Sequence, residues 1–469
     1  MLLRRTLVLA ISSLLFVVGA PPLATAQDRQ SAAQDPPTQR PAAGAPGCKL
    51  DGPLVHIPST AAGPQGLLVR VSPPAKGRYP TGAPIIVHST PLPGTDTSRA
   101  CLKDKGFIEI GFRCPGAQVD SGGGGFTEGG GRPGPHVCMQ ALADVLAFVT
   151  GRIRSVENKG VQDYAGPVKA LTDNVGVVGW SAGGNLAVLT MARHGLQFPE
   201  LKWYASWESP ILSAVDGGWG SIFQPNRFYD PATAKVDFER LRYSPEMPLW
   251  VWPPQGLPRE PNWPHGGLYL DADGKGVFNK DTDYGFWVAY APLDVGQPRK
   301  AFYTPSVTRE ARDRKVFGAL WPTHIATVDE VEQRASREDA LRHIPEAVRR
   351  LPRLAILVFE SEVGHVTAAA DHPHAIAQVN AWLDAGARWV RFNPDVHYVE
   401  EMMGKRTARD VQYPAGKRLD RNVISNLLEP EETNGGPSDA QGMAAAASEL
   451  ADRIYSNNWA PVLTRVIVQ

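Results

Sequence analysis

Residues Val175 to Gly184 decide the fold, and they read VGVVGWSAGG. The first four residues, from Val175 to Val178, form a short β-branched run that predicts a buried strand. The residues from Ser181 to His194 are largely apolar and are followed by Gly195, a residue that tolerates the left-handed end of a helix. A serine therefore stands at the turn between a predicted strand and a predicted helix.

The turn itself, Gly179-Trp180-Ser181-Ala182-Gly183, matches the pattern G-x-S-x-G. A serine in such a turn is held in a strained conformation with its hydroxyl above the sheet, so the residues two before and two after it must be small. Gly179 and Gly183 provide that clearance. The amide of Ala182 begins the helix and can stabilise a developing oxyanion.

Strand and helix patterns alternate on both sides of this turn, which indicates a mostly parallel sheet covered by helices on both faces. The predicted strands are 84–88, 107–112, 175–178, 201–207, 354–359 and 389–392, and the predicted helices are 139–149, 181–194, 375–385 and 440–455.

These motifs resemble the α/β-hydrolase family, which includes serine esterases and peptidases, and the resemblance covers about Val71 to Tyr455. It implies an α/β-hydrolase fold: a mostly parallel central sheet flanked by helices, with a large cap insertion. It also implies a nucleophile, an acid and a histidine in that chain order, and no required cofactor. The family's second oxyanion donor follows an early strand, which points to the amide of Thr90 here, because Pro91 has none.

The resemblance places the base after the last strand, where His397 is the leading residue. The alternative bases form a second group, His365, His372 and His374.

The acid usually follows the penultimate strand, but Gly364 stands at its expected position, which departs from the family pattern. We rank Glu362 first and Glu208 second, because either carboxylate could orient the histidine. Glu360 and Asp371 are close in sequence and could also supply the acid. The departure also keeps open a second function, that of a binding or scaffold protein that has the hydrolase fold without turnover.

The regular alternation stops between about Ser213 and Arg350, where prolines, aromatic and charged residues dominate. The many tryptophans of this range predict a packed cap or lid. The expected organisation is a signal peptide over 1–26, a disordered Pro/Ala-rich lead-in over 27–47, a hydrolase core over 48–212 and 351–469, and the cap over 213–350.

Carboxylates gather around glycines within the cap, at Asp271, Asp273, Asp281 and Asp283. Such a group has the general chemistry of a calcium loop, although the spacing fits an EF-hand poorly. We favour a polar hairpin turn, and a calcium ion bound there would serve to order the cap.

The N-terminal residues predict export, because Arg4 and Arg5 precede a short apolar run and Ala24 and Ala26 form a cleavage pattern. We expect a periplasmic or extracellular protein without integral membrane association once the signal is removed. The four cysteines, Cys48, Cys101, Cys114 and Cys138, would then reach an oxidising compartment and form two disulfides, and the sequence does not choose among the three pairings.

The formal net charge is zero and no block of Lys and Arg is present, which argues against a nucleic-acid partner. The sequence therefore predicts a serine hydrolase that acts on a small-molecule or polymeric ester or amide, with Ser181 as nucleophile.

Overall fold

The structure is a computed structural model, and it describes the chain from Cys48 to Ala460 with gaps. The expected signal peptide and lead-in lie outside the described residues. The described ranges are 48–89, 97–98, 100–115, 135–209, 211, 219–220, 229–230, 235–236, 249–252, 267–279, 282–286, 288–293, 297–361, 373–404, 408–420, 422–427 and 437–460.

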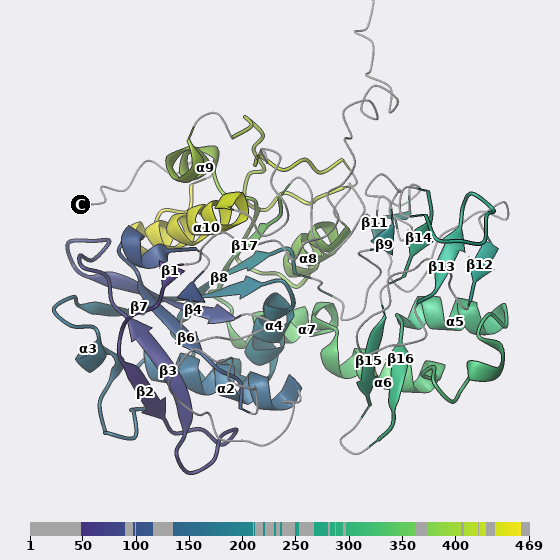
Figure 1. Cartoon of the computed structure of the whole chain (residues 1–469). Helices are drawn as coiled ribbons and strands as arrows, with labels where there is room; N and C mark the ends of the chain where they lie inside the picture. Colours follow the sequence, from purple (N-terminus) through teal and green to yellow (C-terminus); the bar gives the residue numbers. More distant parts are fainter. Residues whose placement is uncertain are drawn as a thin grey trace, which may run out of the picture. The chain divides into compact units, whose positions relative to one another are not determined.

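An eight-stranded sheet forms the centre of the fold (Figure 1), in the order β18-β17-β8-β7-β4-β6-β3-β2. The strands β18, β17, β8, β7, β4 and β6 pair in parallel, whereas β3 pairs antiparallel with both β6 and β2. Their bounds are β2 Leu54–Ile57, β3 Leu67–Ser72, β4 Ala83–Ser89, β6 Ile108–Phe112, β7 Ala170–Trp180, β8 Leu201–Trp207, β17 Ala355–Phe359 and β18 Trp389–Phe392. The expected mostly parallel sheet is confirmed.

Helices cover the two faces of this sheet and bury its apolar residues. They are α2 Pro135–Val149, α3 Val161–Tyr164, α4 Ala182–His194, α7 Ala340–Arg350, α8 Pro373–Asp384, α9 Val396–Met403 and α10 Pro437–Ser456. Side chains of α2, α4, α7 and α8 share one core with the sheet, and side chains of α9 and α10 share the other.

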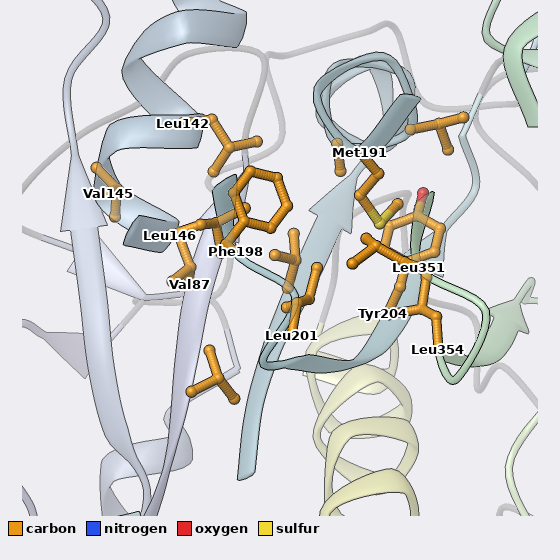
Figure 2. Close-up of a cluster of buried hydrophobic side chains, with 14 of the residues drawn as sticks. Val87, Leu142, Val145, Leu146, Met191, Phe198, Leu201, Tyr204, Leu351 and Leu354 are labelled. Carbon is orange, nitrogen blue, oxygen red and sulfur yellow. The ribbon is translucent and has the colours of Figure 1, made fainter. Parts of the chain in front are cut away.

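Figure 2 shows part of the first core, where Leu146 of α2 and Met191 of α4 lie among side chains of the strands, including Val87 and Tyr204. The second core contains Trp180, Trp203 and Trp207 together with the small residues of α10. The small residues of α10 include the alanines from Ala444 to Ala447. They let this helix, yellow in Figure 1, pack closely against β7, β8 and β17. The helix from 440 to 455 was predicted, and the structure extends it at both ends.

The described part of the range 213–350 holds short strands, the helices α5 and α6, and a hydrophobic core of its own. Trp250, Phe286 and Tyr303 are buried in that core, and Trp252 and Trp321 pack against it. The helix α7 also falls in this range, but Ala340, Ile344 and Ala347 belong to the core of the main sheet. The elements are β9 Trp219–Gly220, β10 Tyr229–Asp230, β11 Lys235–Val236, β12 Leu249–Val251, β13 Tyr269–Asp271, β14 Tyr284–Gly285, β15 Ala289–Pro292, β16 Arg299–Phe302, α5 Pro305–Asp313 and α6 Val328–Glu338.

Two disulfides fasten the first third of the chain, and they settle the pairing that the sequence left open. Cys48 of β1 (Cys48–Lys49) is bonded to Cys101, and Cys114 is bonded to Cys138 of α2. The first bond also lies beside the pairing of β1 with β5 (Thr97–Ser98). Two disulfides are consistent with an oxidising compartment. Among the described residues, none of the helices is both long and apolar enough to cross a membrane.

Candidate active site

Ser181 occupies the turn between β7 and α4, as the sequence predicts. Its backbone angles are φ 49° and ψ −130°, in a region that residues other than glycine rarely adopt. Its N–H donates to the carbonyl oxygen of Trp207 at 2.9 Å, and its own carbonyl accepts from the N–H of Gly184 at 2.8 Å. The turn is therefore bonded to both the next strand and the new helix, and the side chain stays partly exposed.

Small residues make this turn sterically feasible. A Cβ placed on Gly179 would lie 2.5 Å from the Cα of Gly184, and one placed on Gly184 would lie 1.8 Å from the Oγ of Ser209. The close approach thus involves Gly179, as the sequence analysis expected, and also Gly184. Gly183 contributes its carbonyl oxygen, which accepts a 2.7 Å hydrogen bond from the buried Oγ of Ser89.

Ala182 is the first residue of α4 and is exposed, so its amide lies at the positive end of the helix dipole beside Ser181. Thr90, the expected second oxyanion donor, lies outside the described residues. It follows Ser89, the last residue of β4, and β4 pairs directly with β7.

Glu208 directly follows β8 and is next to the nucleophile turn, because Trp207 accepts the hydrogen bond from Ser181. It is 1% exposed and has a φ of 42°. Its N–H donates to the carbonyl oxygen of Phe359 at 3.1 Å, and its carboxylate accepts a hydrogen bond from the hydroxyl of Ser361. The sequence analysis ranked Glu208 second, after Glu362.

Glu360 directly follows β17 and is 4% exposed. Because β8 and β17 are paired up to Trp207 and Phe359, Glu208 and Glu360 occupy matching positions at the carboxyl edge of the sheet. Burial, and then the negative charges of Glu208 and Asp439, raise the pKa of Glu360 well above its usual value. The raised pKa favours the neutral form of this carboxyl. The remaining two acids, Glu362 and Asp371, lie outside the described residues.

His374 is the second residue of α8 and is 3% exposed. Gln378, one turn later on the same helix face, accepts a hydrogen bond from the Oγ of Ser206 at 3.2 Å. Because α8 connects two parallel strands, it runs antiparallel to them. One turn back along α8 covers ~6 Å and two residues forward along β8 cover ~6.6 Å. From these rises we infer that His374 lies near the level of Glu208.

His397, the leading base from the sequence, lies in the first turn of α9, and its side chain is exposed. Its backbone N–H donates to the carboxylate of Asp395 at 3.1 Å, which caps that helix. Its strand, β18, is the edge strand, three positions from β7 in the sheet order. His365 and His372 lie outside the described residues.

The sequence analysis did not predict a row of buried, hydrogen-bonded polar side chains that ends beside Ser181. His88, Glu109 and Trp180 are connected by hydrogen bonds within the apolar core on the α10 side of the sheet. One signal in the sequence could have revealed it, because Glu109 interrupts the apolar run of β6 and a buried carboxylate needs a partner.

Three of the four calcium candidates, Asp271, Asp273 and Asp283, offer oxygens that lie within 4.8 Å of one another. The amide of Lys275 donates to the first two, at 3.2 and 3.1 Å. The hydrogen bond from the Lys275 side chain is the main cause that lowers the pKa of Asp273, to about 2. These contacts are those of a polar turn, and calcium binding stays a prediction. Asp281 lies outside the described residues.

The sequence matches no family model and none of the curated proteins. Among solved structures the chain is similar to an α/β-hydrolase, GrgF, from Penicillium sp. sh18, at 11% identity over 73% of this chain and 89% of that chain, with a TM-score of 0.32. It is similar to an acetyl xylan esterase from Paenibacillus sp. R4, at 13% identity over 73% and 81% of the two chains, with a TM-score of 0.31. A puromycin-hydrolysing peptidase of Mycobacterium tuberculosis matches at 12% identity over 74% and 34%, with a TM-score of 0.30. The strand order and the strand-serine-helix turn are themselves those of an α/β-hydrolase fold.

Proposed function

We propose that the protein is an exported serine hydrolase that cleaves a carboxylic ester or an amide through an acyl-enzyme. The observation that carries the proposal is the strained turn at Ser181, held at φ 49° between a buried strand and a helix. Strain of this kind persists only where the surrounding structure enforces it, and it is typical of functional sites. The two disulfides and the N-terminal signal pattern support export.

We assign the acid to Glu208. It is buried, it is next to the strand residue that binds Ser181, and the Ser361 hydroxyl fixes its carboxylate. Glu360 fits the role less well, because its raised pKa favours the neutral carboxyl, and a neutral carboxyl cannot stabilise an imidazolium by charge.

We assign the base to His374. It is buried at the level of Glu208, whereas His397 is exposed and begins a helix at the edge strand. A base must come within hydrogen-bond reach of the hydroxyl that it deprotonates. The burial of His374 on the helix that contacts β8 supports this choice over the position expected from the family.

The reaction then follows from these roles. His374 removes the proton of Ser181 as the Oγ attacks the carbonyl carbon, and the amide of Ala182 stabilises the oxyanion. The imidazolium, stabilised by Glu208, gives its proton to the leaving alcohol or amine as that bond breaks. A water molecule deprotonated by His374 next attacks the acyl carbon, and the acid leaves as Ser181 regains its proton.

Hydrolysis of short p-nitrophenyl esters by matched variants tests these assignments. We expect Ser181→Ala and His374→Gln each to lower kcat by at least about a thousandfold, because groups that act as a unit fail together. We expect His397→Gln to keep the wild-type rate. Glu208→Gln should lower kcat, whereas Glu360→Gln, which mimics a protonated carboxyl, should not.

The opposite pattern would overturn individual assignments. Loss of activity in His397→Gln with full activity in His374→Gln would return the base to the position expected from the family. Full activity in Ser181→Ala would exclude the proposed nucleophile, and a folded protein that is inactive on every acyl substrate would favour a binding or scaffold role.

A further inference from the structure

The indole of Trp180 connects the nucleophile turn to a buried polar chain. Trp180 immediately precedes Ser181 and is 2% exposed. Its Nε1 donates to Nδ1 of His88 at 3.4 Å, and its ring packs edge-on against Trp207 with centroids 5.5 Å apart. Trp207 is also the residue whose carbonyl oxygen binds the N–H of Ser181. The side chain before the nucleophile is therefore held from two sides.

His88, which binds the indole of Trp180, is also hydrogen-bonded to Glu109. Its Nε2 lies 2.9 Å from Oε1 of Glu109, and the two residues are 5% and 0% exposed. The indole N–H of Trp180 can only donate, so Nδ1 of His88 must accept, and Nε2 carries the proton that is given to Glu109. One tautomer thus satisfies both contacts of the ring.

Glu109 in turn is anchored by two further donors. The Oγ of Ser98 donates to its Oε1 at 2.6 Å, and the backbone N–H of Lys103 donates to its Oε2 at 2.9 Å. Burial alone would raise the pKa of Glu109. The hydrogen bond from His88, the electrostatic attraction of the His88 ring, and the hydrogen bonds from Ser98 and Lys103 outweigh burial and lower it. Glu109 is therefore an ionised acceptor that forms strong hydrogen bonds.

The segment that supplies these donors is itself fastened covalently. Ser98 pairs with Cys48 in the short ladder of β1 and β5. Cys48 is bonded to Cys101, which directly precedes the 3-10 helix Leu102–Lys105 that contains Lys103. The chain of contacts thus runs from a disulfide, through Glu109 and His88, to the residue before the nucleophile.

We propose that His88 and Glu109 are positioning residues for Ser181, which fix the nucleophile turn through the indole N–H of Trp180. This inference rests on the proposed function, because it concerns the geometry of the same serine. Misplacement of a reacting group costs rate even where the chemistry is intact, so the positioning should appear in kcat and not in substrate affinity.

Two tryptophan variants form a matched test. Trp180→Phe removes the N–H that binds His88 and keeps an aromatic ring in the core. Trp203→Phe removes a comparable buried N–H, the one that donates to Oδ1 of Asn174 at 3.0 Å in the same core, away from the turn. The measurements are the second-order rate of labelling by a fluorophosphonate probe, kcat and KM on a short ester, and the melting temperature.

We expect Trp180→Phe to slow labelling and lower kcat by about tenfold, the value of one lost hydrogen bond, with KM within about twofold of wild type. Trp203→Phe should melt at a similarly lowered temperature and label at the wild-type rate. Glu109→Gln should act in the direction of Trp180→Phe, because an amide cannot accept from all three of the donors that bind the carboxylate.

Each contrary outcome decides against a specific claim. Wild-type labelling of Trp180→Phe, or equal slowing in both tryptophan variants, would show that the chain serves packing alone and would overturn the positioning role. If the wild-type protein is folded but is not labelled, the proposed function fails together with this inference.

Discussion

At the scale of single residues, the proposed site combines one local motif with two groups that come from distant parts of the chain. Ser181 lies within a local motif whose geometry depends on the residues within two positions. Glu208 and His374 are separated from it by long stretches of chain. Glu208 follows β8, which pairs with β7, and the helix of His374 contacts β8 through Gln378. The ranking of Glu362 ahead of Glu208 relied on a family position, and it stays a prediction because Glu362 lies outside the described residues. The burial of Glu208 could not be predicted, because it depends on how β8 lies in the sheet.

The charge state of Glu360 gives a testable dependence of stability on pH. Its pKa is raised in the fold, so above the usual value near 4.5 the native protein binds more protons than the unfolded chain. The contribution of Glu360 to the free energy of unfolding therefore decreases as pH rises from 4.5 toward the raised pKa. Glu360→Gln removes that contribution, and we expect its stability relative to wild type to increase over this window.

Urea denaturation at several pH values measures the difference. Glu109→Gln is the control, with the opposite dependence on pH. The pKa of Glu109 is lowered in the fold, so this carboxylate stabilises the native protein above its usual pKa. That stabilisation is lost as pH falls through the lowered pKa. A Glu360→Gln variant whose relative stability stays flat or falls as pH rises above about 4.5 would contradict the raised pKa of Glu360.

At the scale of elements, the apolar runs predicted six of the eight strands of the central sheet and missed β2 and β3. The ends of most of the six agree with the structure to within one residue. β7 is the main exception, because it spans Ala170–Trp180 where the sequence analysis expected only 175–178. Asn174 interrupts the apolar pattern, and a strand assignment needs the contacts that sequence does not show. In the structure its side chain accepts from the indole of Trp203 at 3.0 Å and donates to the carbonyl oxygen of Ala451 at 2.9 Å.

The start of α4 lies so close to the end of β8 that one added methyl group at Gly184 should lower stability. Gly184→Ala would place a Cβ 1.8 Å from the Oγ of Ser209, so the helix or the strand end must move. We expect a loss of about 1–3 kcal/mol of stability together with slower labelling of Ser181. Gly160→Ala is the control, because its Cβ would meet nothing nearer than 3.9 Å. Equal effects of the two substitutions would contradict the close packing described for the turn.

At the scale of the whole molecule, the sequence predicted the fold class but not how its distant parts are joined. The number of cysteines indicated two disulfides, yet the pairing depends on which Cα atoms approach, here to 5.2 and 5.0 Å. The expected cap range also included α7, whose residues Ala340 and Ile344 pack in the main core. The composition of the sequence shows where prolines and aromatic residues replace the regular alternation of strands and helices. It does not show which core a helix packs against.

The Cys48–Cys101 disulfide closes a loop with a sequence separation of 53 residues, and its loss should destabilise the fold. The loop-entropy relation gives about 4 kcal/mol for a loop of this length. We expect the double variant Cys48→Ser, Cys101→Ser to unfold at clearly lower urea concentration than wild type. An unchanged midpoint, with the second disulfide intact by mass spectrometry, would show that the first one does not constrain the chain.

The central claim is that one hydroxyl, that of Ser181, is activated for attack on an acyl group. The most direct measurement is peptide mapping of the folded protein after reaction with a fluorophosphonate, with the adduct located by tandem mass spectrometry. We predict a single adduct on Ser181 that is absent from Ser181→Ala and reduced in His374→Gln. An adduct on another serine, or none on protein whose cooperative unfolding shows it to be native, would contradict the account.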